Sequence, residues 1–235
     1  MPERGISGPF EEKIKKQLQE KGPFWNWKYS GVDKKILGGG SECVVIPLEG
    51  SENKVAAITL KDLSSYEAKK MFYNQRILST LFPYNFPKIY ASFAKHPDPK
   101  IQNISGTIRQ RIEGPTRWQL EKKLEHEGTL LKLLRIVTEK DKIKYPFEEA
   151  EDGLNQAGLP VGYDTMEDNF MVGADGGEYY VDTPNVYIEI TDVDKLMAYM
   201  QKNKYTAEDI ETVRKSIERL RELGKIEEEK NHKQK

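Results

Sequence analysis

Two aspartates and one asparagine stand close together in the second half of the chain. Asp164 and Asn169 lie in the stretch GYDTMEDNFMV, and Asp182 follows in the stretch YYVDTP. Carboxylate and amide oxygens are the ligands that Mg²⁺ prefers, and a carboxylate can also orient an attacking hydroxyl group. These side chains could therefore serve the transfer of a phosphoryl group from ATP, which needs both functions.

Glycines and a lysine in the first half of the chain could bind the phosphates in such a reaction. The triplet Gly38, Gly39 and Gly40 ends a stretch that reads as a strand. Glycine allows backbone amides to approach phosphate oxygens closely. Lys61 ends another expected strand, VAAITLK, where its ammonium group could neutralise phosphate oxygens.

Taken in this order, the segments resemble motifs of the protein-kinase-like superfamily over residues 33–185. LGGGSECVV, which ends at Val45, resembles the glycine-rich loop, with Cys43 in place of its third glycine. Lys61 is similar in position to the phosphate-binding lysine of the family. GYDTMEDNFMV resembles the catalytic loop H-R-D-x-x-x-x-N, and YYVDTP resembles the strand that leads to D-F-G.

The resemblance implies ATP and Mg²⁺ as cofactors, and it implies a role for each matching residue. Asp164 would be the catalytic base, Lys61 would contact the phosphates as a second catalytic residue, and Asn169 and Asp182 would hold Mg²⁺. A larger set would bind the nucleotide: Gly38, Gly39, Gly40, Val45, Lys61, Glu67, Gln110 and Ile112.

The sequence leaves the acidic partner of Lys61 open. The spacing of the family places this partner near Asn74, whose amide cannot form an ion pair. Glu67 lies two turns earlier on the same helical face and could substitute for it. Alternatively, Glu67 only closes a capping box that begins at Ser64.

The chain also departs from the pattern of the family. Gly162 and Tyr163 replace the His-Arg that precedes the base, and Thr183-Pro184 replaces the Phe-Gly after Asp182. No segment similar to A-P-E follows, and no long activation loop or full peptide-docking lobe is expected. The chain is therefore more similar to compact members of the superfamily, such as RIO-type, aminoglycoside-type and lipopolysaccharide-type kinases.

The elements expected around these residues form a strand-rich half and then a helix-rich half. Strand patterns cover 33–61, 86–94 and 105–114, and the helix after the first of these ranges starts at a capping box. Capping boxes also predict helices from Thr116, Thr191 and Thr206, and further helices are expected over 129–140 and 146–157. The stretch FMVGADGGEYYVD reads as a hairpin with its turn at Asp175-Gly176-Gly177.

Pattern and resemblance together predict an α+β, two-lobed, protein-kinase-like fold. An N-terminal antiparallel sheet with one helix would precede a reduced, mostly helical C-terminal lobe. The expected domains are a helical and aromatic extension over 1–30, with a helix over 10–21, an N-lobe over 31–113 and a C-lobe over 114–224. Residues 225–235 have a single apolar side chain, Ile226, which predicts a disordered tail.

Composition narrows the class of protein. Charged residues make up 32% of the chain and the net charge is −1, so nucleic acid is not expected as the main partner. Cys43 is the only cysteine, which excludes an internal disulfide. The sequence shows neither a signal peptide nor an apolar run of transmembrane length, so a cytoplasmic protein without membrane insertion is expected.

These observations favour an ATP- and Mg²⁺-dependent phosphotransferase that acts on a hydroxyl group, and serine or threonine of a protein is the preferred acceptor. A small-molecule kinase is one alternative, because the helical lobe is reduced. A pseudokinase that acts as a nucleotide-binding scaffold is another, because the glycine, His-Arg and Phe-Gly positions are replaced. A third interpretation is a helical protein that binds nucleic acid or a partner and whose motifs match by chance.

Overall fold

The computed structural model describes residues 37–39, 43–48, 51–59, 63–94, 105–120, 142–182, 187–188 and 192–233, except for the side chains of 227–233. These residues form two units, each with its own hydrophobic core. The N-terminal unit contains the residues up to Phe72 and Ile89–Arg111, and the C-terminal unit contains Tyr73–Lys88 and the residues from Ile112 onward. The helices expected over 10–21 and 129–140 lie outside the described residues.

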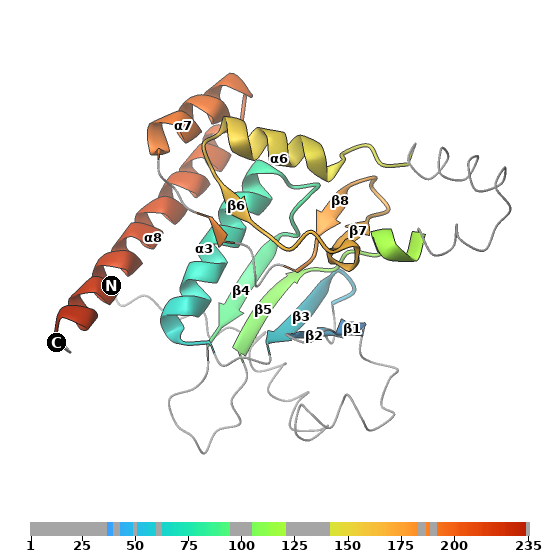
Figure 1. Ribbon diagram of the computed structural model, residues 1–235, viewed down its shortest axis with the longest axis horizontal. Helices are drawn as coiled ribbons and strands as arrows, with labels where there is room; N and C mark the ends of the chain where they lie inside the picture. Colours follow the sequence, from blue (N-terminus) through green and yellow to red (C-terminus); the bar gives the residue numbers. More distant parts are fainter. Residues whose placement is uncertain are drawn as a thin grey trace, which may run out of the picture. The chain divides into compact units, whose positions relative to one another are not determined.

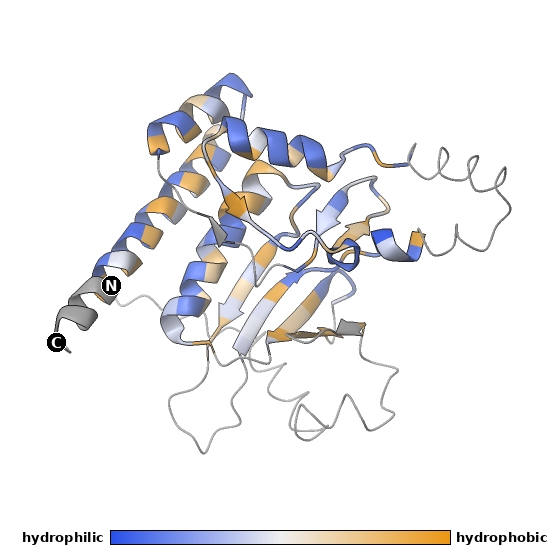
Figure 2. Ribbon diagram, in the orientation of Figure 1, coloured by the Kyte–Doolittle hydropathy of each residue, from blue (hydrophilic) through white to orange (hydrophobic). Residues whose placement is uncertain are grey.

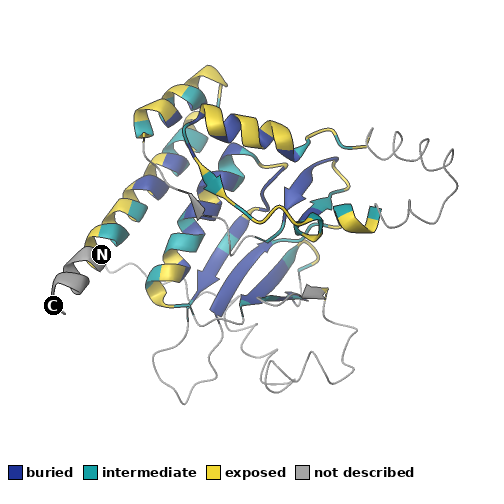
Figure 3. Cartoon of the chain, viewed as in Figure 1, coloured by how far each residue is buried: buried dark blue, intermediate teal, exposed yellow. Residues whose placement is uncertain are grey.

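An antiparallel sheet of five strands makes up most of the described part of the N-terminal unit. Its strands lie in the order β1-β2-β3-β5-β4, which can be followed in Figure 1. Residues 55–58 of the central strand are all buried (Figure 3), and this strand has a neighbour on each side. The strands are β1 (Gly38–Gly39), β2 (Cys43–Pro47), β3 (Lys54–Thr59), β4 (Ile89–Phe93) and β5 (Ser105–Gln110).

One long helix, α3 (Ser65–Leu81), follows β3 and contributes residues to both units. The predicted capping box at its start is confirmed. The hydroxyl of Ser64 accepts a hydrogen bond from the N–H of Glu67 at 3.2 Å, and the Glu67 carboxylate accepts one from the N–H of Ser64 at 2.7 Å. The two bonds satisfy backbone donors that a helix start leaves unpaired.

The described part of the C-terminal unit contains the helical turn over 117–120, three further helices, a short 3-10 helix and two small sheets of two strands each. The helices are α6 (Phe147–Gln156), α7 (Val193–Lys202), α8 (Ala207–Lys233) and the 3-10 helix η2 (Glu167–Asn169). One sheet pairs β6 (Val161–Gly162) with β9 (Tyr187–Ile188), and the other pairs β7 (Phe170–Val172) with β8 (Glu178–Tyr180).

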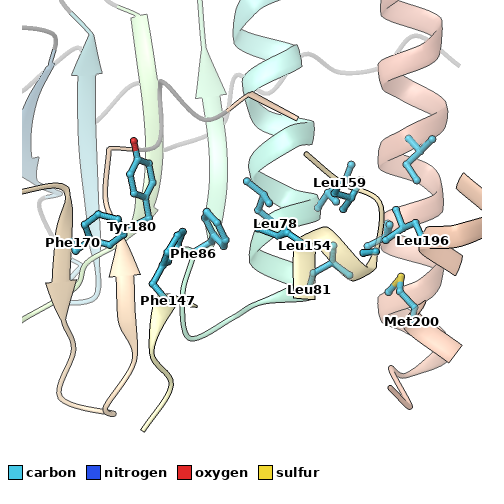
Figure 4. Close-up of a cluster of buried hydrophobic side chains, with 14 residues drawn as sticks. Leu78, Leu81, Phe86, Phe147, Leu154, Leu159, Phe170, Tyr180, Leu196 and Met200 are labelled. Carbon is cyan, nitrogen blue, oxygen red and sulfur yellow. The ribbon is translucent and has the colours of Figure 1, made fainter. Parts of the chain in front are cut away.

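The core of the C-terminal unit joins the end of α3 to these helices and to the β7–β8 hairpin. Figure 4 shows aromatic rings at one end of this cluster and aliphatic side chains at the other. Apolar residues recur along α8 between polar ones (Figure 2), and two of them, Val213 and Ile217, are buried in this core. Ile210 and Leu220 pack against the same core, so α8 contacts it through one apolar stripe.

Two of the three predicted capping boxes in the second half of the chain are confirmed. Thr116 and Gln119 exchange hydrogen bonds of 3.0 and 3.1 Å, and Thr206 and Asp209 form the corresponding pair at 3.1 and 3.2 Å. The predicted cap of α7 is wrong by one residue. Its N-cap is Asp192, whose carboxylate accepts a hydrogen bond from the N–H of Lys195 at 2.9 Å, because aspartate caps a helix at least as well as threonine.

The expected disordered tail is also corrected in part, because α8 continues to Lys233. Glutamate and lysine, which dominate this stretch, have a high intrinsic helix propensity. The helix can therefore extend beyond its apolar stripe without further burial. None of the helices in the described ranges combines the length and the apolar content that a membrane crossing requires.

The fold class predicted from the sequence is confirmed. The described residues have an α+β fold, in which an antiparallel N-terminal sheet and the helix α3 are followed by a mostly helical unit.

Candidate functional site

The β7–β8 hairpin holds the two candidate metal ligands at its open end. Phe170 pairs with Tyr180 in the ladder, and one position further out the N–H of Val181 donates to the carbonyl of Asn169 at 2.8 Å. Asn169 therefore lies across from Val181, so the two candidate ligands, Asn169 and Asp182, stand at the same end of the hairpin. Both side chains are half-buried.

The closed end of the hairpin has the turn that its sequence predicts. The N–H of Gly173 donates to the carbonyl of Gly177 at 2.8 Å, and Asp175 accepts a hydrogen bond from the N–H of Gly177 at 3.0 Å. Gly176 has a φ of +86°, a backbone conformation that glycine adopts at little cost. The turn fixes the register of the hairpin and thereby the position of its open end.

Asp164 is connected to this open end by two hydrogen bonds. The side-chain amide of Asn169 donates to the carbonyl of Asp164 at 3.3 Å, and the N–H of Asp164 donates to the hydroxyl of Tyr180 at 3.1 Å. A third bond orients the carboxylate itself, since one Asp164 oxygen accepts from the N–H of Met166 at 3.1 Å. The structure thus brings together Asp164, Asn169 and Asp182, while the Asp164 side chain stays exposed.

The electrostatics at Tyr180 reflect both carboxylates. Burial of the hydroxyl is the largest cause that raises its pKa, and the hydrogen bond from the Asp164 N–H acts in the opposite direction. The negative charges of Asp182 and Asp164 raise the pKa further, because they oppose a second negative charge beside them. The two carboxylates therefore act on the same buried group.

The residues at the open end fit a magnesium ion by their chemistry. Asn169 and Asp182 supply an amide and a carboxylate oxygen, and Mg²⁺ commonly uses one or two protein ligands together with waters and phosphate oxygens. In the described ranges, no three His, Cys, Asp or Glu side chains come together as a metal site.

The residues at the His-Arg position form part of the same loop. Gly162 ends β6, and the hydroxyl of Tyr163 donates to the carboxylate of Glu151 in α6 at 2.6 Å. Burial raises the pKa of Tyr163, and the hydrogen bond to Glu151 raises it further. Tyr163 therefore stays protonated and ties the loop that carries Asp164 to α6.

Part of the candidate phosphate site lies in the N-terminal sheet. Gly38 and Gly39 form β1, and Gly38 pairs with the half-buried Val45 of β2. Gly40 and Lys61 lie outside the described residues. The glycine-rich stretch is thus part of a hairpin in the structure, and its assignment to phosphate binding remains a prediction.

The two candidate adenine contacts lie at the end of β5. Gln110 is the last residue of the strand and belongs to the N-terminal unit, whereas Ile112 begins the later part of the C-terminal unit, and both are half-buried. The N–H of Arg111 between them donates to the carbonyl of Asn53 at 3.0 Å. The backbone N–H of Arg111 is therefore already hydrogen-bonded within the N-terminal unit.

Glu67 and Asn74 differ sharply in environment. Glu67 is exposed, and the hydrogen bond from the Ser64 N–H is the main cause that lowers its pKa. Asn74 is only 4% exposed, and its side-chain oxygen has no hydrogen-bond partner among the described residues. The capping role of Glu67 is confirmed, while an ion pair with Lys61 remains a prediction.

A partly buried ion pair that the sequence pattern did not indicate supports the hairpin. One Glu178 oxygen accepts two hydrogen bonds from Arg117, at 2.6 and 2.9 Å, and the other accepts from the N–H of Phe147 at 2.9 Å. The Arg117 guanidinium also lies 4.6 Å from the centre of the Phe170 ring. An acidic residue inside an otherwise apolar strand was the signal that could have indicated this pair.

No family model matches the chain, and no curated protein matches it. Solved structures do match it. The GDP and kanamycin complex of APH(2")-IIia has a TM-score of 0.37 and 14% identity, over 84% of this chain and 96% of that one. The GDP complex of wild-type aminoglycoside 2'-phosphotransferase-IIIa has a TM-score of 0.34 and 12% identity, over 84% and 95%.

Proposed function

We propose that the chain is a Mg²⁺-dependent phosphotransferase that moves the γ-phosphoryl group of a nucleoside triphosphate to a hydroxyl group of a small molecule. The observation that carries the proposal is a pair of hydrogen bonds that connect Asp164 to Asn169 and to Tyr180. Both partners belong to the end of the hairpin that also carries Asp182. A base and two metal ligands within a few residues of each other are what phosphoryl transfer requires.

Asp164 is proposed to orient the acceptor hydroxyl and to accept its proton. Its carboxylate is exposed, and among the hydrogen bonds of the described chain only one of its two oxygens is engaged, with the N–H of Met166. That bond and the backbone bond to Tyr180 hold the carboxylate in place. The second oxygen is thereby left to face an acceptor.

Asn169 and Asp182 are proposed to hold Mg²⁺, which would neutralise charge on the phosphate oxygens. Lys61 and the glycines from Gly38 to Gly40 are proposed to bind the phosphates, and Gln110 and Ile112 the base of the nucleotide, as the resemblance implies. ATP is the proposed donor, and GTP belongs in every assay because both similar structures hold GDP.

The short path after Asp182 favours a small acceptor over a protein. β9 begins at Tyr187, only five residues on, and pairs with β6 directly before the Asp164 loop. The N-cap of α7 follows at Asp192. A long segment that could cover the site and dock a peptide has no place in this path, so we prefer the small-molecule reaction to transfer onto serine or threonine.

The test is a comparison of Asp164→Asn with Asp168→Asn. Asp168 is an exposed aspartate in η2 and serves as a control for loss of charge in the same loop. The assay follows phosphate release from Mg-ATP and Mg-GTP, with and without kanamycin as a hydroxyl probe. We expect Asp164→Asn to lose about 10²–10⁴-fold in kcat, as removal of a general base does, and Asp168→Asn to match the unmodified chain.

Asp182→Asn tests the metal site separately. Loss of the carboxylate should abolish the Mg²⁺-dependent rise in thermal stability with nucleotide, because an amide cannot compensate the charge of the ion. An unmodified chain that nucleotide stabilises but that releases no phosphate would contradict catalysis and support the pseudokinase alternative. Equal rates in the Asp164 and Asp168 variants would remove Asp164 from the mechanism.

A further inference from the structure

Tyr180 is a buried tyrosine whose ring belongs to the core and whose hydroxyl belongs to the candidate site. The side chain is 0% exposed. Its ring centre lies 5.4 Å from that of Phe170, 5.6 Å from that of Tyr163 and 6.0 Å from that of Phe147. Its hydroxyl oxygen points away from the other labelled aromatic rings in Figure 4.

The hydroxyl contacts the backbone of the proposed base. It accepts the hydrogen bond from the N–H of Asp164 at 3.1 Å. Within the described part of the chain, its own hydrogen has no acceptor among the hydrogen bonds, although burial of an unpaired donor is costly. A phenylalanine would fill the same space without that cost, so the core alone does not account for a tyrosine at this position.

We propose that Tyr180 is a positioning residue of the phosphotransfer site, which holds the backbone of Asp164 against the strand that leads to Asp182. This inference rests on the proposed function. Tyr180 lies in β8, two residues before Asp182, and pairs with Phe170, the neighbour of Asn169. The hydroxyl therefore links the base to the same hairpin that carries both proposed metal ligands.

The consequence concerns geometry rather than binding. A base that shifts by a fraction of an ångström against the metal ligands loses alignment with the reacting phosphate, and rate falls although nucleotide affinity does not. The hydrogen bond from the Asn169 side chain to the Asp164 carbonyl is long, at 3.3 Å, and is the weaker of the two connections. Of these two hydrogen bonds, the one to Tyr180 therefore restrains the position of Asp164 relative to the proposed metal ligands more strongly.

The experiment compares Tyr180→Phe with Tyr179→Phe. The second variant is a matched control, because Tyr179 is also buried and its hydroxyl donates to Asp175 in the hairpin turn at 2.6 Å. Each variant keeps a ring and loses one hydroxyl. The readouts are kcat and KM for Mg-ATP hydrolysis and the midpoint of thermal unfolding.

We expect Tyr180→Phe to lower kcat about 10-fold with KM within about twofold, and Tyr179→Phe to leave kcat unchanged. Equal kcat values in Tyr180→Phe and the unmodified chain, or equal losses in both variants, would overturn the inference. Activity that survives Asp164→Asn would instead overturn the proposed function itself. Loss in Asp164→Asn without loss in Tyr180→Phe would leave the function standing and reject only the positioning role.

Amide exchange of the unmodified chain gives a measurement that does not depend on how the variants fold. The N–H of Asp164 should be protected although its side chain is exposed, because the buried hydroxyl of Tyr180 is its acceptor. Exchange of this amide at the rate of a free loop would also reject the inference.

Discussion

Glu178 is the residue on which the support of the hairpin depends most. Its side chain is 3% exposed and faces the guanidinium of Arg117, which is 30% exposed. Its second oxygen is bound to the N–H of Phe147 at the start of α6. One carboxylate thus connects the hairpin to two other segments of the C-terminal unit.

Loss of that charge should be costly. We expect Glu178→Gln to lower the free energy of unfolding by about 2–4 kcal/mol, because the Arg117 charge is then left partly buried without its partner. Glu148→Gln is the control, since Glu148 lies 3.7 Å from the same guanidinium and is 70% exposed. An exposed pair of this kind contributes less than about 1 kcal/mol. Urea denaturation of both variants measures the difference, and equal midpoints would contradict the prediction.

Glu67 should give α3 a stability that depends on pH. The Ser64 N–H bond lowers its pKa in the folded chain below the ordinary 4.5. The carboxylate therefore stabilises the fold above that value, and this contribution disappears as the pH falls through the lowered pKa. Glu67→Gln should be less stable than the unmodified chain at neutral pH, and the gap should close in acid. Denaturation at a series of pH values tests this, and a gap that widens in acid would refute it.

At the scale of elements, the hairpin depends on a glycine outside it. A β-carbon added at Gly114 would lie 1.8 Å from the carbonyl oxygen of Val172 in β7. The neighbouring backbone bond, from the N–H of Val172 to the carbonyl of Pro115, is 3.0 Å long. The segment before residue 115 can therefore lie along β7 only if it has no side chain.

We expect Gly114→Ala to destabilise the chain by about 1–3 kcal/mol, since backbone atoms must separate to admit the methyl group. Gly162→Ala is the matched control, because a β-carbon there meets nothing within 4 Å. That variant should change stability by less than about 0.5 kcal/mol. Thermal unfolding of the two variants compares them directly, and similar losses in both would show that the close approach does not matter.

The elements differ in how far the sequence could predict them. The caps at Thr116 and Thr206 and the turn at Asp175 were readable, because each depends on residues two or three positions apart. The strands β6 and β9 were not, because two residues show no alternation and their partners are distant in the chain. Pairing of this kind is decided by tertiary packing rather than by local propensity.

The same distinction applies to the candidate site. The spacing of Asn169 and Asp182 indicated a hairpin that presents both, and the structure has that hairpin. The contact between Asp164 and Tyr180 and the pair of Glu178 with Arg117 were missed, because a tyrosine and a single acid in a strand have many uses. Only the folded chain shows which groups they meet.

At the scale of the whole molecule, two hydrophobic cores predict that truncating a core side chain destabilises mainly the unit that contains it. Ile58 lies in the core of the N-terminal unit and Leu196 in that of the C-terminal unit, and both are 0% exposed. Truncation of either to alanine should cost about 2–5 kcal/mol. Because α3 contributes residues to both units, its amides should respond to both changes.

Amide exchange distinguishes the effects of the two truncations. Ile58→Ala should speed exchange mainly in β2, β3 and β5, and Leu196→Ala mainly in α6 and α8. Equal acceleration throughout the chain in both variants would mean that the two cores unfold as one.

The β7–β8 hairpin also has a consequence for how the chain folds. Residues 164–182 hold every group of the proposed base and metal site, and their contacts close only short loops. Short loops cost little entropy to close, and hairpins form within about 1–10 μs. The oxygen ligands can therefore meet early, before distant strands have paired. A cation bound at that stage would stabilise a partly folded chain as well as the native one, and so would speed folding rather than only strengthen its product.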